Sequence, residues 1–142
     1  MTPSKALLMT IDSSLDNVSL IGNAVRGILE NEPGPGHDIP LVELAVCEAV
    51  NNAIIHSYGQ KEGFPVEVSL GFDAGRLTVS VADLGRGFET FPETLPRVPD
   101  GKDLKDMPIG GWGLRIIGEV MEDVRYSKGS GRNVLVMSRA WA

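Results

Sequence analysis

The chain has 142 residues, of which 42% are hydrophobic and 23% are charged, and its formal net charge is −6 at pH 7. This composition is typical of one compact domain, and the acidic balance argues against nucleic acid or an anionic membrane surface as a partner. We find no signal peptide and no apolar run of about 18 residues that would span a membrane, so we expect a cytoplasmic protein. With Cys47 as the single cysteine, no internal disulfide can form.

Periodicity and turn residues predict strands and helices along most of the chain. In order they are a strand at 5–11, helices at 15–30 and 40–58, strands at 66–72 and 77–83, a helix at 111–121, and strands at 124–127 and 133–138. A long irregular segment, 84–109, is typical of a functional loop. Strands grouped beside segregated helices predict one α+β domain over residues 1–142. We expect a two-layer sandwich with a mixed, mostly antiparallel sheet and helices on one face.

The second predicted helix is apolar on nearly every side but carries a polar stripe. Glu48, Asn52 and His56 recur every four residues and so share one face, with Asn51 beside them. A face in water would carry several charges, yet none follows Glu48 until Lys61. Because a buried carboxylate or amide needs a partner, we interpret the stripe as a functional surface.

Asp83 ends an alternating strand in phase with its inward-facing residues and opens the sequence Asp-Leu-Gly-Arg-Gly. A carboxylate at the end of a core face can accept a hydrogen bond from an amino group, such as that of a purine. Gly85 and Gly87 allow the backbone to come close to a ligand. The motif is not a calcium loop, because Arg86 and the lack of further acids at the right spacing spoil that pattern.

Glycines also lead into the third predicted helix, in the sequence Ile-Gly-Gly-Trp-Gly-Leu-Arg at 109–115. A helix N-terminus offers free N–H groups and a positive dipole to a phosphate. The segment is neither a Walker A loop nor a dinucleotide fingerprint, and taken alone it could equally be a chain reversal. A further glycine-rich segment, 129–133, is best explained as a hairpin turn.

In this order, the Glu-x-x-x-Asn helix, the Asp-x-Gly-x-Gly turn, the long loop and the Gly-x-Gly-Leu helix start resemble the N, G1 and G2 boxes of the GHKL ATPase superfamily. This superfamily includes histidine kinases and type II topoisomerases. Within it, residues 48–58 look like bacterial anti-sigma-factor serine/threonine kinases, and the resemblance covers nearly the whole chain. It implies the histidine-kinase-like, Bergerat-type fold, ATP and Mg²⁺ as cofactors, and an ATP lid at about 88–109.

The resemblance also implies a role for each matching residue. Glu48 would be the general base that takes a proton from a serine or threonine hydroxyl of a partner. Asn52 would ligate Mg²⁺, and Asp83 would accept a hydrogen bond from the adenine amino group. The other residues expected to bind the nucleotide are Asn51, His56, Gly85, Gly87, Gly111, Trp112, Gly113, Leu114 and Arg115.

The chain departs from the family pattern at two places. Ile109 stands where some such kinases carry a basic residue, so Arg115, or Lys102 or Lys105 in the lid, would supply positive charge to the γ-phosphate. In the last box the family often has Gly-Thr, where this chain has an arginine followed by Asn133. We expect this second difference to affect phosphate transfer more than nucleotide binding.

The resemblance further implies protein partners. The substrate would be a small anti-anti-sigma protein with a STAS domain, and a sigma factor could be held by a homodimer in partner switching. The alternatives are an ATP- or ADP-gated binding module without catalysis, and an ATP hydrolase in which Glu48 activates water. Two weaker ones are a detached histidine-kinase catalytic domain and an enzyme that uses Glu48 and Asp83 as an acid/base pair.

Overall fold

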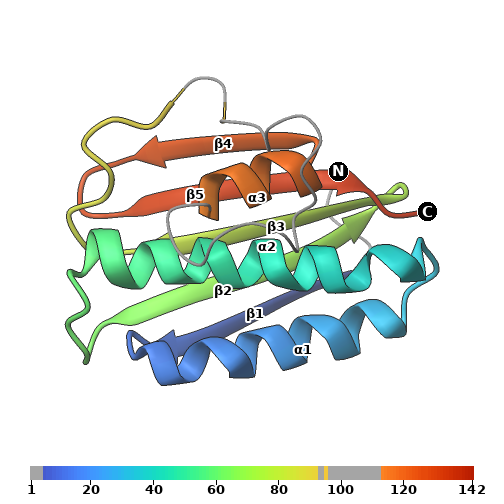
Figure 1. Ribbon diagram of the computed structural model, residues 1–142, viewed down its shortest axis with the longest axis horizontal. Coiled ribbons are helices and arrows are strands. Elements are labelled where there is room, and N and C mark those ends of the chain that lie inside the picture. The colour runs from blue at the N-terminus through green and yellow to red at the C-terminus, as the bar shows by residue number, and fades with distance from the viewer. Residues whose placement is uncertain (1–4, 93–94, 96–112) are drawn as a thin grey trace.

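The computed structural model describes residues 5–92, 95 and 113–142 (Figure 1). Its elements lie where the sequence predicts them, with small shifts at their ends. Their bounds are β1 Lys5–Asp12, α1 Val18–Glu30, α2 Ile39–Asn52, β2 Pro65–Asp73, β3 Arg76–Asp83, α3 Gly113–Val120, β4 Asp123–Lys128 and β5 Asn133–Ala140.

Both long helices deviate from α geometry at one end. The first begins with a 3₁₀ turn, Leu15–Asn17, in which the Ser14 hydroxyl accepts a hydrogen bond from the backbone N–H of Asp16. Such capping satisfies an N–H group that has no partner inside the helix. The second continues past Asn52 as a π-helical turn, Ala53–Ser57. π-Helical turns occur often at functional sites, and this one follows directly on the polar stripe.

One sheet holds all five strands, in the order β1-β2-β3-β5-β4. All four strand pairings are antiparallel, so the sheet is purely antiparallel rather than mixed. The turn between β2 and β3 has positive φ at Ala74 (49°) and Gly75 (76°), as the common two-residue hairpin turn requires. Every second side chain is buried along β2 and along β3 up to Val81, which confirms the predicted alternation and the inward phase of Asp83. At the end of β3 the intervening Ala82 is buried as well.

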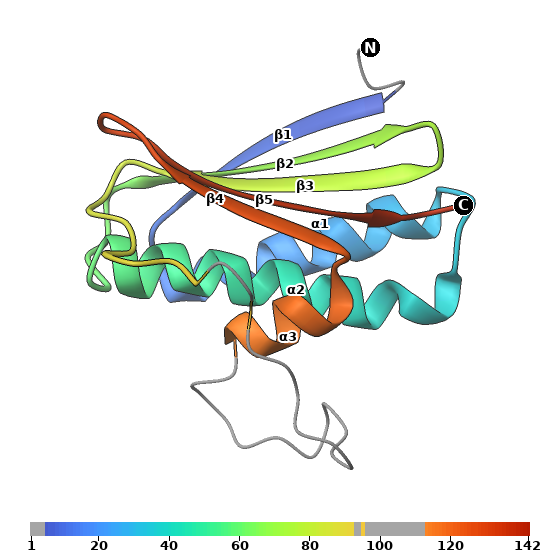
Figure 2. The ribbon, with the colours of Figure 1, turned by 90° about the horizontal axis from the view of Figure 1, so that it is seen from above.

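The helices form a second layer on one face of the sheet, and α2 lies between α1 and α3 (Figure 2). Val42, Val46 and Val50 of α2 are completely buried and belong to the same core cluster as β2 and β3 side chains. The apolar character of nearly every side of this helix predicts a buried helix, but on its outer side Leu41 and Leu44 are more than a third exposed. This follows from the architecture, because a layer one helix thick leaves one side of each helix in solvent.

The sequence analysis finds no apolar run long enough to span a membrane, but one helical stretch meets that test. The helical stretch Gly36–Ser57 is long and apolar enough, by length and composition, to cross a membrane. It lies along the sheet (Figure 1), and its buried side chains belong to the hydrophobic core. Core helices of folded domains meet the same length and hydropathy criteria, so the stretch is explained by packing.

Candidate functional site

The polar stripe of α2 and the start of α3 meet at one point. A Cβ placed on Gly113 would lie 2.9 Å from Oε2 of Glu48 and 3.5 Å from both the amide nitrogen and the amide oxygen of Asn52. The two motifs are far apart in sequence, and the fold brings the first turn of α3 against a carboxylate and an amide. Glycine at position 113 leaves this approach open, since any side chain would occupy the space.

Burial changes the chemistry of two side chains on the stripe, those of Glu48 and Asn52. Glu48 is half-buried, and desolvation raises the pKa of its carboxyl above the usual value. The amide nitrogen of Asn52 is buried and has no hydrogen-bond partner among the described residues. A half-turn of that amide would place its oxygen at the same position, because the two ends of an asparagine amide have nearly the same shape.

These features fit a hard divalent cation such as Mg²⁺. Carboxylate and amide oxygens are suitable ligands, and Mg²⁺ in nucleotide sites uses few protein ligands together with substrate phosphates and water. The amide nitrogen of Asn52, which has no partner in the described part of the chain, lies beside the space that Gly113 leaves open, and the Glu48 carboxylate borders the same space.

The second part of the site is built around Asp83 at the end of β3. Asp83 is 6% exposed, and its Oδ1 accepts hydrogen bonds of 2.9 Å from the backbone N–H of Gly85 and from Nδ2 of Asn133. The same Nδ2 also donates to the carbonyl oxygen of Gly85, again at 2.9 Å. Asn133 therefore lies at the Asp83 end of the site, next to the residue expected to read the base.

Both glycines of the Asp-x-Gly-x-Gly turn are required by close packing. A Cβ on Gly85 would overlap the carbonyl oxygen of Ser57, and a Cβ on Gly87 would lie 2.5 Å from the hydroxyl of Tyr126. Gly87 also has φ of +72°, which L-residues with a side chain rarely adopt. The structure thus gives both glycines a packing role within the protein, and their predicted approach to a ligand stays a prediction.

Two tyrosines hold this turn in place, and sequence reasoning missed both. The hydroxyl of Tyr58 donates to the carbonyl oxygen of Pro65 and accepts from the N–H of Leu84, while the hydroxyl of Tyr126 accepts from the N–H of Phe88. Tyr58 closes the predicted helix and Tyr126 lies in a predicted strand, so neither pattern distinguishes them from ordinary packing residues.

Between α2 and the sheet lies a small cavity of about 10 Å³. Its lining residues are Ala49, Asn52, Ala53, Ser57, Val81, Asp83, Phe88, Tyr126 and Leu135. The cavity is narrow because aromatic rings close it: the ring centroid of Phe88 is 5.2 Å from that of Tyr126 and 5.4 Å from that of Phe91. Asn52 and Asp83 line this one cavity, which joins the first and second parts of the site.

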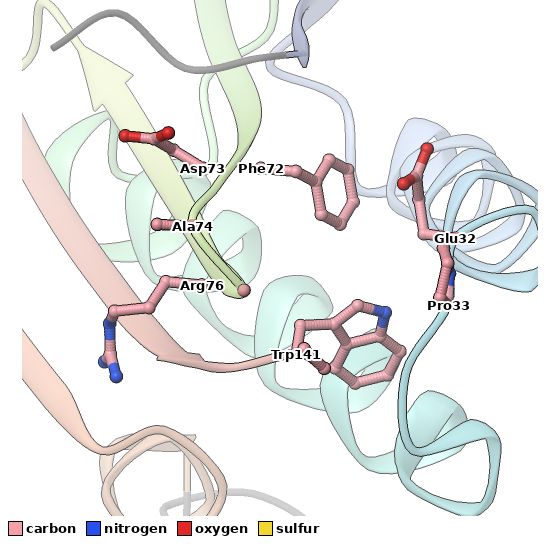
Figure 3. Close-up of a pocket in the computed structure, with 9 residues that line it drawn as sticks. Glu32, Pro33, Phe72, Asp73, Ala74, Arg76 and Trp141 are labelled. Carbon is pink, nitrogen blue, oxygen red and sulfur yellow. The ribbon is translucent and has the colours of Figure 1, made fainter.

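Wider hollows lie elsewhere and contain none of the predicted site residues. One of about 210 Å³ lies at the turn between β2 and β3, where the side chains of Phe72, Trp141 and Glu32 line the opening (Figure 3). A shallower one of about 290 Å³ lies beside Ile11 and Phe64. Neither combines acidic and amide side chains with a helix N-terminus.

Four further predicted site residues, His56, Asn51, Leu114 and Arg115, lie in the described part of the chain, and two do not. His56 is exposed, its ring centroid lies 5.5 Å from that of Phe88, and its carbonyl oxygen accepts a hydrogen bond from Nε of Arg86. Asn51 is half-buried and does not line the small cavity. Leu114 and Arg115 are half-buried in the first turn of α3. Gly111, Trp112, Ile109, Lys102, Lys105 and most of the expected lid lie outside the described residues.

Residues 11–139 match the family model of the histidine kinase-like ATPase domain. The chain is 30% identical to the serine-protein kinase RsbW of Halalkalibacterium halodurans, over 92% of this chain and 80% of that protein. It is 31% identical to the serine-protein kinase RsbW of Listeria innocua, over 87% of this chain and 76% of that protein.

Solved structures share the fold. The RsbU and RsbW domains of a Mycobacterium tuberculosis protein match with a TM-score of 0.68 at 19% identity, over 98% of this chain and 32% of that one. The histidine kinase domain of a blue-light activated kinase from Erythrobacter litoralis matches with a TM-score of 0.55 at 18% identity, over 92% of this chain and 62% of that one. These matches confirm the predicted histidine-kinase-like fold.

Proposed function

This chain belongs to the histidine kinase-like ATPase domain family and, with its relatives, to the serine-protein kinases within it; from that premise we propose that it transfers the γ-phosphate of ATP to a serine or threonine hydroxyl of a small partner protein. The observation that carries the proposal is the meeting of Glu48, Asn52 and the first residue of α3. A proton acceptor, a metal ligand and a phosphate-binding helix end then lie together.

In the proposed reaction Glu48 is the general base. Its carboxylate takes the proton of the partner's hydroxyl, the hydroxyl oxygen forms a bond to the γ-phosphorus, and the bond from that phosphorus to the bridging oxygen of ADP breaks. Burial raises the pKa of Glu48, which supports this role, because a carboxylate with a higher proton affinity is a better base. Half-burial also leaves the carboxyl accessible to a hydroxyl brought by a partner.

The remaining residues would bind the nucleotide. Asn52 would hold Mg²⁺, which supplies charge compensation for the phosphates when it is bound. Asp83 would accept the adenine amino group, and the N-terminal turn of α3 at Gly113 would face the phosphates. The other nucleotide-binding residues proposed are Asn51, His56, Gly85, Gly87, Gly111, Trp112, Leu114 and Arg115, beneath a lid at about 88–109.

We further propose the nature of the partner and the setting. The substrate would be a small anti-anti-sigma protein with a STAS domain, and the kinase would also hold a sigma factor, as a homodimer, in the cytoplasm. Support comes from the similarity to the RsbW kinases and from the acidic charge of the chain, which disfavours nucleic acid as the target.

Phosphotransfer tests the proposal directly. The protein is incubated with Mg-ATP and the STAS-domain protein encoded nearest to it, and the intact mass of that protein is measured. We expect the addition of one phosphate with wild type, and also with Glu62→Gln, a control at an exposed glutamate that is not among the proposed site residues. Glu48→Gln should abolish the addition while it retains ATP binding, and Asn52→Ala should lose both.

Two results would contradict the proposal. Tight Mg-ATP binding with no phosphate on the partner would instead indicate a nucleotide-gated binding module. Rapid release of phosphate in the absence of any partner, dependent on Glu48, would indicate an ATP hydrolase.

A further inference from the structure

Asn133 is placed to control how Asp83 presents its carboxylate. It begins β5 directly opposite Asp83 of β3 in the strand register, and only 2% of it is exposed. Its Nδ2 donates to two acceptors, Oδ1 of Asp83 and the carbonyl oxygen of Gly85, both at 2.9 Å. Because both partners are acceptors, only the NH₂ end of the amide can face them, and the orientation of the side chain is therefore determined by its partners.

These bonds leave the two oxygens of the carboxylate unequal. Oδ1 of Asp83 accepts from both Asn133 and the N–H of Gly85, whereas Oδ2 accepts no hydrogen bond within the part of the chain that the structure describes. An unrestrained aspartate carboxyl rotates easily about its last bond. Two donors on one oxygen oppose that rotation, and since Asp83 lines the cavity, Oδ2 is the acceptor that remains for a ligand.

The amide is also held from its other side. A Cβ on Gly87 would lie 2.8 Å from Oδ1 of Asn133, so the glycine turn packs directly against this side chain. Asn133 thus connects β3, the turn after it and β5 at the point where the base is expected. The Asn133 side chain therefore contacts Asp83, which is the expected acceptor, and both glycines of the turn, Gly85 and Gly87.

We propose that Asn133 is a specificity-determining residue that favours 6-aminopurine over 6-oxopurine nucleotides by holding Asp83 so that Oδ2 accepts from the exocyclic amine. The proposal rests on the proposed nucleotide site and adds the reason for its base preference. A 6-oxopurine brings a carbonyl oxygen to the same place, where two acceptors would face each other. Leaving buried acceptors unpaired is costly, and sites built for one hydrogen bond reject the analogue that lacks it.

The test compares ATP with the triphosphate of purine riboside, which lacks only the 6-amino group. Binding of each to the full chain is measured with Mg²⁺ by calorimetry, without any partner protein. Wild type should bind ATP about tenfold more tightly than the purine analogue, as one hydrogen bond to a charged group predicts. In Asn133→Ala we expect the affinity for ATP to fall by about that factor and the affinity for the analogue to change less than about threefold. The preference for ATP should therefore disappear.

Asn133→Thr provides a second variant if the alanine variant folds poorly, because its hydroxyl can still donate one hydrogen bond. It should keep part of the preference for ATP. Asn23→Ala, at an exposed asparagine of α1, is the matched control and should retain the wild-type preference. GTP should bind weakly to wild type. In Asn133→Ala the affinity for GTP should increase relative to the affinity for ATP.

Several outcomes would overturn the inference. If Asn133→Ala weakens ATP and the analogue equally, the residue has a structural role only. An unchanged preference in both variants would show that Asp83 needs no such support. Neither result bears on phosphotransfer, which is measured separately, whereas failure of wild type to bind any of these nucleotides would refute the nucleotide site itself.

Discussion

Gly113 at the start of α3 lies against the carboxylate of Glu48 on α2, at a distance that leaves no room for a side chain: a Cβ on Gly113 would be 2.9 Å from Oε2 of Glu48. The atom in the way is the end of a flexible side chain, which can move at low cost. The carboxylate would therefore be displaced while the fold is retained, and position 113 connects the phosphate-binding helix end to the proposed base.

Gly113→Ala should accordingly impair catalysis without loss of stability. We expect kcat to fall by at least about tenfold, because small displacements of a reacting group are costly. The midpoint of thermal unfolding should stay the same or rise, since alanine is the better helix former by up to about 1 kcal/mol per residue. Phosphotransfer and thermal unfolding are measured on the same sample. A variant with full activity would contradict the proposed geometry.

The glycines of the Asp-x-Gly-x-Gly turn should behave in the opposite way. Gly85→Ala would press a Cβ onto the backbone oxygen of Ser57, which cannot turn aside, so we expect a loss of about 1–3 kcal/mol of unfolding free energy. Gly27→Ala is the matched control. It lies within α1 with nothing within 4 Å of the added Cβ, and it should stabilise by roughly 0.5–1 kcal/mol. Urea denaturation measures both, and equal effects would contradict the packing described.

The raised pKa of Glu48 predicts a pH-dependent contribution to stability. Burial disfavours the ionised form, so the folded protein keeps this proton at a pH at which the unfolded chain has released it. The contribution is complete below the usual pKa of glutamate and is lost as the pH rises through the raised value. Glu48→Gln, which stays neutral, should therefore be more stable than wild type at about pH 8 and equally stable at about pH 4.

Urea midpoints at the two pH values check this expectation, with Glu62→Gln as the exposed control that should show little difference at either pH. If Glu48→Gln raised the urea midpoint by the same amount at both pH values, packing and not ionisation would distinguish the two side chains. The activity of wild type should also decline on the acid side, because a protonated Glu48 cannot accept the hydroxyl proton.

Phe88 should control entry to the base cavity. The cavity of about 10 Å³ is too small for a purine, and the ring of Phe88 forms part of its wall. Association is slowed when a side chain must move first, so Phe88→Ala should raise the association rate constant of ATP several-fold. Stopped-flow binding measures the rate. Phe64→Ala, at a phenylalanine outside this cavity that is 44% exposed, should leave the rate unchanged, and an unchanged rate in Phe88→Ala would show that the ring does not limit entry.

Much of the fold and one half of the site follow from the sequence because they depend on local periodicity. Alternation along β2 and β3 predicted both strands and the inward phase of Asp83, and the structure confirms them. The four-residue spacing of Glu48 and Asn52 likewise predicted a shared helical face. These relationships lie within one element, so its geometry alone determines them.

The contacts between elements were decided by the tertiary structure. The bonds from Asn133 to Asp83 and Gly85, and the approach of Gly113 to Glu48, join residues 48–65 positions apart. They depend on β5 pairing with β3 and on α3 packing beside α2, which no local pattern specifies. From the sequence, the departure at Asn133 was expected to affect phosphate transfer more than nucleotide binding. In the fold, its side chain lies beside Asp83. The chain's periodicities determine its elements, but which polar groups meet depends on strand order and on how the helices cover the sheet.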